Sequence, residues 1–187
     1  MEEFGVLETG EKFSFKGYEY LMKPYSDEHP FQVHKKCTQV GITTKALFSA
    51  LHGCINKYPK GIIYFFPTDR DVTDFSRGRV SPIIEHNKII GQYIADTDTV
   101  GMKRVNKSFI YFRGMKSKSQ LKSVPADKII IDELDEVEDQ TAPEMAAKRL
   151  SASDFQHREY LSNPTIPDYG IDKMFQLSDQ KHYMLNR

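Results

Sequence analysis

The chain has no excess of either charge and no long hydrophobic run. Its 26 basic and 26 acidic residues cancel, so the net charge selects no class of binding partner. No apolar stretch approaches the roughly 20 residues needed to span a bilayer. The first five residues, Met-Glu-Glu-Phe-Gly, lack the basic and apolar regions of a signal peptide. These absences argue against a membrane partner and predict a protein that stays in the cytoplasm.

Cysteine is also scarce, with only Cys37 and Cys54 in the chain. Together with His34 and His52, these residues have the ligand types of a metal site. However, His52 and Cys54 are two positions apart on an expected helix, so their side chains point to different faces. We therefore expect reduced, partly buried cysteines and not metal ligands.

The length of 187 residues suits one compact α/β domain. A hydrophobic content of 39% and a charged content of 28% are ordinary for a globular protein and exclude a disordered chain. The pattern predicts strands at 31–37, 62–66, 107–113, 128–132 and 157–161, and helices at 43–58, 69–87 and 143–151, the second broken near Gly78 and Pro82. Strands that alternate with helices predict a three-layer sandwich with a mostly parallel sheet.

The segment from Lys36 to Thr44 lies between the first expected strand and the first expected helix, which is the context of a phosphate loop. In such a loop, backbone N–H groups and the helix N-terminus cradle phosphates, a lysine reaches the outer phosphates, and a hydroxyl binds magnesium. Gly41 supplies the turn and Thr43 the hydroxyl. The usual lysine position, just before that hydroxyl, holds Ile42 instead.

Three amines flank this loop, those of Lys35, Lys36 and Lys45. Lys36 opens the loop and can fold its stem back across it, whereas Lys45 is carried one residue further into the helix. We therefore predict that Lys36 is the phosphate lysine. The predicted nucleotide-binding residues are Lys36, Cys37, Thr38, Gln39, Val40, Gly41, Ile42, Thr43 and Thr44, with Tyr25 and Gln32 upstream as adenine contacts.

A second segment ends in two carboxylates. Three isoleucines at 129–131 precede Asp132 and Glu133, which predicts a buried strand whose carboxyl end emerges at a ligand crevice. Asp132 is placed to hold a hydrated magnesium ion and Glu133 to orient an attacking water as general base. The alternative is an ordinary core strand that leads into a solvated acidic loop, because further acids follow at once, namely Asp135, Glu136, Glu138 and Asp139.

Further candidates lie outside these two segments. Ser162, Asn163 and Thr165 close the last expected strand, where they either sense a terminal phosphate or form a bare turn. Arg77 and Arg79 are either arginine fingers or ordinary surface arginines.

Basic residues are unevenly distributed along the chain. Between Met102 and Ser123 there is no acid, and the basic residues are Lys103, Arg104, Lys107, Arg113, Lys116, Lys118 and Lys122. Such a run can bind a DNA backbone despite zero net charge, or it can form a solvated hairpin face.

In order and spacing, these motifs resemble the N-terminal ATPase domain of a large terminase, the motor that packages DNA into the procapsids of tailed bacteriophages. The resemblance covers essentially the whole chain. It rests on Gln39-Val40-Gly41 with the following Thr-Thr, Ser76 to Pro82, Leu121-Lys122-Ser123, Ile131-Asp132-Glu133 and Ser162-Asn163-Pro164-Thr165. It implies a P-loop NTPase of the additional-strand, catalytic-glutamate type that uses ATP and Mg²⁺, with hydrolysis driving translocation of double-stranded viral DNA.

The resemblance also assigns roles to individual residues. One branch of the family has its loop lysine at the beginning, which supports Lys36. Gln39 occupies a place where some relatives carry arginine, so a finger from within the loop is absent, and Arg77 and Arg79 remain as candidates. Coupling of hydrolysis to movement is assigned to Ser162, Asn163 and Thr165.

As partners, the resemblance implies double-stranded DNA, a portal protein and a small terminase subunit, within a pentameric ring at the procapsid portal vertex in the host cytoplasm. Whole large terminases continue into an RNase H-like nuclease domain, so residues 1–187 are expected to be the ATPase domain without nuclease activity. Two alternatives remain. One is a helicase-like DNA translocase, because Asp132 to Asp135 resembles the acidic motif of those enzymes; the other is a non-hydrolysing DNA-binding scaffold, because Ile42 replaces the standard lysine.

Overall fold

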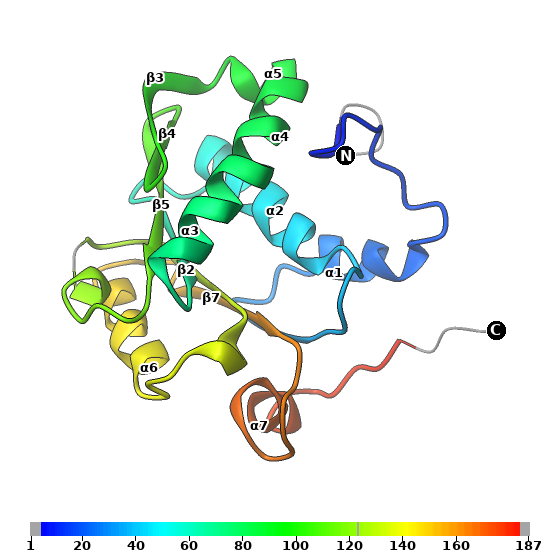
Figure 1. Ribbon diagram of the computed structural model, residues 1–187, viewed down its shortest axis with the longest axis vertical. Helices are drawn as coiled ribbons and strands as arrows, with labels where there is room; N and C mark the ends of the chain where they lie inside the picture. Colours follow the sequence, from blue (N-terminus) through cyan, green and yellow to red (C-terminus); the bar gives the residue numbers. More distant parts are fainter. Residues whose placement is uncertain (1–4, 123, 184–187) are drawn as a thin grey trace.

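A single sheet organises the fold, as seen in a computed structural model that describes residues 5–122 and 124–183. Within these residues seven strands lie in the order β1-β7-β6-β2-β5-β4-β3 (Figure 1). Strands β1, β7, β6, β2 and β5 run parallel, and β4 and β3 continue the sheet antiparallel. Their bounds are β1 Phe31–Lys35, β2 Ile62–Phe66, β3 Ile94–Thr99, β4 Met102–Val105, β5 Ser108–Gly114, β6 Lys128–Asp132 and β7 His157–Ser162.

Helices cover both faces of this sheet. In Figure 1, α2, α3 and α4 lie on one side, and α6 and α7 on the other. The helices are α1 Met22–Ser26, α2 Ile42–Asn56, α3 Asp69–Phe75, α4 Ser81–His86, α5 Lys88–Gly91, α6 Ala142–Ala147 and α7 Gly170–Gln176. Short 3-10 helices are η1 Glu19–Leu21, η3 Gln120–Lys122, η4 Leu134–Glu136 and η5 Lys148–Leu150, and η2 Ser76–Val80 is a π-helix.

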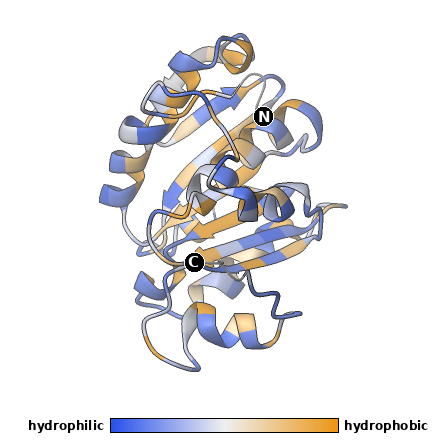
Figure 2. Cartoon of the chain, turned by 90° about the vertical axis from the view of Figure 1, so that its right-hand side faces the viewer, coloured by the Kyte–Doolittle hydropathy of each residue, from blue (hydrophilic) through white to orange (hydrophobic). Residues whose placement is uncertain are grey.

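Strand β2 shows why the sheet is buried on both faces. Its Ile62, Tyr64 and Phe66 pack into the core shared with α2, whereas Ile63 and Phe65 pack into the core shared with α6. This division follows from the strand geometry, in which successive side chains point to opposite faces. Figure 2 shows the hydrophobic residues concentrated on the central strands. The predicted three-layer sandwich with a mostly parallel sheet is confirmed.

The predicted elements are present with small shifts in their ends. Strand β6 has the predicted bounds, and α2 lies within two residues of the predicted helix. At the predicted break near Gly78 the chain forms a π-helix, after which Pro82 sits in the first turn of α4. The pattern missed α1, β3, β4, α5 and α7. None of the described helices is long and apolar enough to cross a membrane.

Candidate active site

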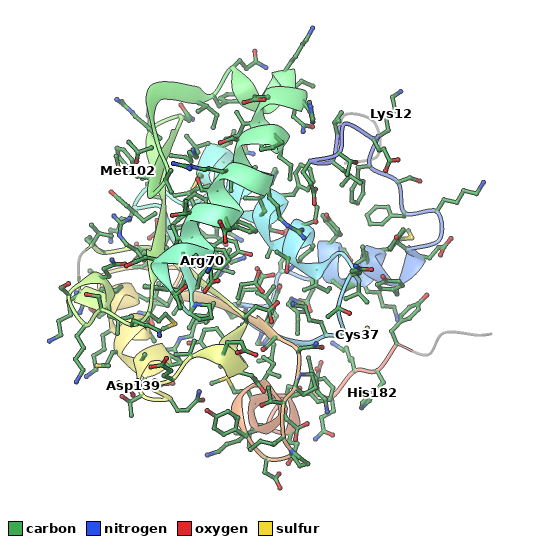
Figure 3. The ribbon with its side chains drawn as sticks, viewed as in Figure 1. Lys12, Cys37, Arg70, Met102, Asp139 and His182 are labelled. Atoms are coloured by element: carbon green, nitrogen blue, oxygen red, sulfur yellow. The ribbon has the colours of Figure 1, made fainter. Side chains whose placement is uncertain are left out.

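The loop from Lys36 to Thr44 joins β1 to the N-terminus of α2, and Figure 3 labels Cys37 on it. Gly41 precedes the helix with φ of 78°, a left-handed conformation that glycine adopts without strain. A Cβ at this position would lie 2.9 Å from Leu21 Cδ1. No described side chain caps this end of α2, so the first backbone N–H groups can serve an anion. The loop therefore leaves backbone N–H groups at the start of α2 available to an anion.

The three lysines beside the loop differ in where their ammonium groups lie. Lys35 Nζ is 2.6 Å from Asp172 Oδ1, which lies on α7. Lys45 Nζ is buried, 2.9 Å from Glu159 Oε1 on β7. Both amines are thus engaged within the protein, and Lys36 is the lysine that turns toward the acidic pair.

Lys36 connects the loop to the end of β6. Its Nζ donates to Glu133 Oε1 at 2.7 Å and lies 3.8 Å from Asp132 Oδ1. The Lys36 side chain is 9% exposed, whereas that of Glu133 is 42% exposed. The structure therefore brings together two segments that lie far apart in the sequence, with the lysine shielded and the glutamate open to solvent.

Asp132 is buried beside the hydroxyl of Thr43. Hydrogen bonds from Thr43 and from Tyr64, whose Oη lies 3.1 Å from Asp132 Oδ2, stabilise its ionised form. Burial nevertheless outweighs these bonds and the nearby Lys36 ammonium, and it raises the pKa of Asp132 to about 6. The carboxyl is mostly ionised at neutral pH, so the carboxylate and the adjacent hydroxyl provide the hard oxygen donors that magnesium prefers.

Thr43 and Asp132 together suit a magnesium ion, which needs few protein ligands, better than a metal ion that protein side chains alone would coordinate. Among the described residues, no group of three or more His, Cys, Asp or Glu side chains is placed to hold a metal. Magnesium usually keeps several waters and binds one or two protein oxygens together with substrate phosphates. The two cysteines are free thiols, Cys37 exposed and Cys54 buried.

Glu133 has an unusual backbone conformation for a residue other than glycine. Its φ of 53° and ψ of 49° lie in the left-handed region, which costs about 1–2 kcal/mol. Its N–H donates to Asp132 Oδ1 at 3.0 Å, and its carbonyl accepts from Glu136 N at 3.0 Å. These bonds fix a sharp turn at the end of β6. Strain of this kind concentrates at functional sites.

Two hollows adjoin the loop. The larger has a volume of about 680 Å³ and the smaller of about 50 Å³. The larger is within the size range of ligand pockets, and its polar lining consists of Thr43, Thr68, Asp71, Asp74, Arg79, Lys116, Asp132, Glu133, Glu136 and Glu138. The smaller is lined by Lys36, Cys37, Gln39, Val40, Gly41, Ile42, Thr43, Thr44 and Arg79, a set that includes every predicted loop residue except Thr38.

Of the two candidate arginines, Arg79 faces the loop. Its Nη1 lies 3.4 Å from Thr44 Oγ1 and 3.3 Å from Glu8 Oε1, and it lines both hollows. Arg77 is exposed and lines neither. Both belong to the π-helix η2, and π-helical segments are frequently found at functional sites.

The two residues predicted to contact adenine lie outside these hollows. The Tyr25 ring packs against Phe13 and Phe15, with centroids 5.4 Å from each. Gln32 Oε1 accepts from Lys45 Nζ at 2.7 Å. The adenine assignment therefore remains a prediction.

The opening segment supports the loop through Tyr20 and Leu21. Tyr20 Oη donates to Val40 O at 3.0 Å, and the buried Leu21 packs beside Gly41. No periodicity marks this segment, so only its aromatic content hinted at its place beside the loop.

The Ser162 to Thr165 segment lies next to the acidic turn. Ser162 is the buried last residue of β7, and its Oγ accepts from Asp135 N at 3.1 Å and donates to Asn163 O at 3.1 Å. Thr165 donates twice to Asp135 Oδ2, from N at 2.9 Å and from Oγ1 at 3.0 Å. The alternative of a solvated acidic loop is therefore wrong for Asp135, which is buried, although Glu136 is exposed. The sequence offered no signal for this residue beyond its place in an acidic run.

The basic run from 102 onward is partly used inside the protein. Lys103 is buried, and Arg113 Nη1 donates to the carbonyls of Gly101 and Phe112 at 2.6 and 2.8 Å. Lys116 Nζ lies 2.7 Å from Glu138 Oε1. The remaining exposed cations are Arg104, Lys107, Lys118 and Lys122, and Ser123 lies outside the described residues. The exposed, unpaired basic surface in this region is therefore smaller than the sequence suggested.

The fold is similar to solved structures of phage terminases. The HK97 bacteriophage large terminase matches with a TM-score of 0.68 and 12% identity, over 96% of this chain and 40% of that chain. The Thermus phage P74-26 large terminase ATPase domain matches with a TM-score of 0.60 and 16% identity, over 81% of this chain and 70% of that chain. This chain thus spans 40% of the length of the HK97 protein. At these identities the likeness shows a shared fold.

The sequence itself identifies the family. No curated protein matches it. Residues 25–186 match the family described as phage terminase large subunit gpA, ATPase domain. The matched range contains the loop, the acidic pair, both arginines and the Ser162 to Thr165 segment, so the resemblance read from the motifs is confirmed. The chain belongs to the family of the phage terminase large subunit gpA ATPase domain.

Proposed function

We propose that this domain hydrolyses ATP and that hydrolysis drives packaging of double-stranded viral DNA into a procapsid. The observation that carries the ATPase assignment is the 2.7 Å bond between Lys36 Nζ and Glu133 Oε1, beside Asp132. A cation for the phosphates, a magnesium ligand and a base for water thus lie at one end of the sheet. Membership of a terminase family supports the packaging role.

Each residue has a distinct part in this proposal. A phosphate group in the loop competes with Glu133 for the Lys36 ammonium, because both are anionic and the lysine lies between the loop and the glutamate. The carboxylate that Lys36 gives up is then free to orient and deprotonate the attacking water. Thr43 and Asp132 hold magnesium, which when bound neutralises charge on the phosphates.

Other residues stabilise charge and transmit movement in this proposal. Arg79 supplies a second cation from the same subunit, since it lies beside Thr44 at the start of α2. The Ser162 to Thr165 segment couples hydrolysis to movement. The DNA, the portal protein, the small terminase subunit and a pentameric ring are the proposed partners, and they rest on the family alone.

The alternative of a scaffold without nucleotide binding depended on Ile42 in the standard lysine position. The position of Lys36 supports hydrolysis instead, because its ammonium reaches the acidic pair from the start of the loop. The family match likewise favours a packaging motor over a helicase-like translocase.

Calorimetric titration of Mg·ATP into the chain tests the proposal. We expect saturable binding that Lys36→Ala weakens by roughly tenfold or more, since a hydrogen bond to a charged group contributes about 1.5–3 kcal/mol. Glu133→Gln should bind ATP but stop turnover. Lys148→Ala, an exposed lysine on the opposite side of the sheet, serves as the matched control. No saturable binding by the wild type, or undiminished binding by Lys36→Ala, would contradict the proposal.

A further inference from the structure

Asp135 lies two residues after Glu133 and is at the centre of a buried hydrogen-bond network. It is only 8% exposed. Its Oδ1 accepts from Ile171 N at 2.7 Å, and its Oδ2 accepts from Thr165 N and Oγ1 at 2.9 and 3.0 Å. Its own N–H donates to Ser162 Oγ at 3.1 Å. An ionised carboxylate only accepts hydrogen bonds, so three donors converge on this side chain from two other segments.

The fit between Asp135 and the start of α7 is tight. A Cβ at Gly170 would lie 2.3 Å from Asp135 Oδ1 and 2.7 Å from its Cγ. Gly170 also has φ of 48°, in the left-handed region. The sequence therefore places glycine at a position where a side chain would collide with Asp135 and separate α7 from the acidic turn.

The same helix contacts the other half of the nucleotide site. Asp172 Oδ1 accepts from Lys35 Nζ at 2.6 Å, and Lys35 is the residue before Lys36. Asp172 Oδ2 accepts from Asp168 N at 2.9 Å and so fixes the turn that begins α7. One short helix is thus hydrogen-bonded both to the strand that leads into the phosphate loop and to the turn that carries Glu133.

We infer that Asp135 is a positioning residue that joins the catalytic turn, the Ser162 to Thr165 segment and α7 into one unit. This inference rests on the proposed function. When a phosphate takes Lys36 from Glu133, the turn bound by Glu136 N and Glu133 O must adjust, and Asp135 lies inside that turn. Its three accepted bonds carry the adjustment to Thr165 and Ile171. Asp135 therefore links nucleotide binding at Lys36 to a conformational change in the Ser162 to Thr165 segment.

The substitution Asp135→Asn tests this role with little change in volume. The amide replaces one acceptor oxygen by an NH₂ donor, so either Thr165 or Ile171 then faces a donor instead of an acceptor. The matched control is Asp139→Asn, in the same acidic run, whose exposed carboxylate accepts from Thr141. Calorimetry with the Mg²⁺ complex of the non-hydrolysable β,γ-imido analogue of ATP measures binding. Amide hydrogen exchange with and without that analogue measures the response of residues 163–176.

For the wild type and Asp139→Asn, we expect the analogue to change exchange at Thr165 and Ile171. Asp135→Asn should bind the analogue within about threefold of wild type, yet lose this change and lower kcat about tenfold with little effect on KM, the scale of one charged hydrogen bond. If Asp135→Asn does not fold, as judged by circular dichroism, Thr165→Val removes the hydroxyl bond alone and should reduce the change in exchange by a smaller amount.

Other outcomes would overturn the inference. A variant that keeps the exchange response and kcat would show that Asp135 transmits nothing. Faster exchange by the same factor with and without the analogue would show a merely structural residue. A wild type that binds the analogue without any change at these amides would exclude the transmission route but leave the ATPase assignment intact. A wild type that binds no nucleotide would refute the proposed function itself, and this inference with it.

Discussion

The buried carboxylate of Asp132 costs the fold free energy at neutral pH, and Asp132→Asn should recover part of that cost. Burial raises the pKa of this group to about 6, against about 3.9 for an unperturbed aspartate. The folded protein therefore binds the proton more tightly than the unfolded chain does. Stability from this proton is fully present below about pH 4 and is lost as the pH rises through 6. The amide does not titrate, so Asp132→Asn lacks this dependence.

The size of the effect follows from the same shift. Two pKa units correspond to about 3 kcal/mol between the protonated and fully ionised limits. Between pH 7.5 and pH 5 the wild type should gain about 1.4 kcal/mol relative to the variant, a tenfold change in the unfolding equilibrium. The amide also changes the hydrogen bonds to Thr43 and Tyr64, but that contribution is the same at both pH values. This contribution cancels when the stability difference between the variant and the wild type at pH 5 is subtracted from that at pH 7.5.

Urea unfolding measures this quantity directly. The chain has no tryptophan, so far-UV circular dichroism is the suitable probe. The free energy of unfolding is extrapolated to zero urea for both proteins at pH 5 and pH 7.5. The exposed Asp154 provides a control, since Asp154→Asn changes the same chemical group outside the core. An advantage of Asp132→Asn that is equal at the two pH values, or larger at pH 5, would refute the burial argument.

Three further predictions follow from the site and its surroundings. Mg·ATP affinity, measured by calorimetry, should fall as the pH drops below 6, because protonated Asp132 is a poor magnesium ligand; affinity independent of pH would contradict this. Glu159→Gln should lower the free energy of unfolding, measured with urea, by about 3–5 kcal/mol, because Lys45 and Lys128 lose their buried partner. Their ammonium groups lie 2.9 and 2.5 Å from the Glu159 carboxylate. A loss below about 1 kcal/mol would contradict this prediction. Gly41→Ala should lower the free energy of unfolding by about 1–2 kcal/mol and weaken ATP binding, because φ at this position is 78°. An unchanged Tm and an unchanged affinity would show that the loop tolerates a side chain here.

The elements predicted well from sequence are those in which local pattern and tertiary environment agree. Strand β6 is a run of isoleucines, and its isoleucines are fully buried in the sheet. Helix α2 follows a glycine and carries apolar residues at helical spacing, as its packing requires. By contrast, β3 is mostly polar and pairs only at the antiparallel end of the sheet, and α7 is only seven residues long. Strand β3 therefore shows no apolar alternation, and the helical spacing of Ile171, Met174 and Phe175 in α7 extends over too few residues to predict a helix.

The site was predictable to a similar degree. The placement of Lys36 beside Glu133 follows from parallel strands, because the carboxyl ends of β1 and β6 lie at the same edge of the sheet. The burial of Asp135 could not be predicted from sequence, because it depends on where α7 packs. Tyr20 likewise reaches the loop through a turn without regular pattern. The residues that the sequence missed are those held by contacts between irregular segments.

The loop lysine at position 36 should not be replaceable by one at the standard position. Ile42 is 7% exposed and packs in the core cluster with Leu21 and Ala46, so Ile42→Lys removes apolar burial worth about 1.5–3 kcal/mol. A lysine side chain at position 42 would also start from the first turn of α2, whereas the Lys36 ammonium reaches the acidic pair from the end of β1. The double variant Lys36→Ala/Ile42→Lys should therefore bind Mg·ATP no more tightly than Lys36→Ala, and it should unfold at lower urea concentration. Recovery of wild-type affinity in calorimetry would show that either route serves the phosphates, and that the contact between lysine and glutamate does not determine where the lysine must lie.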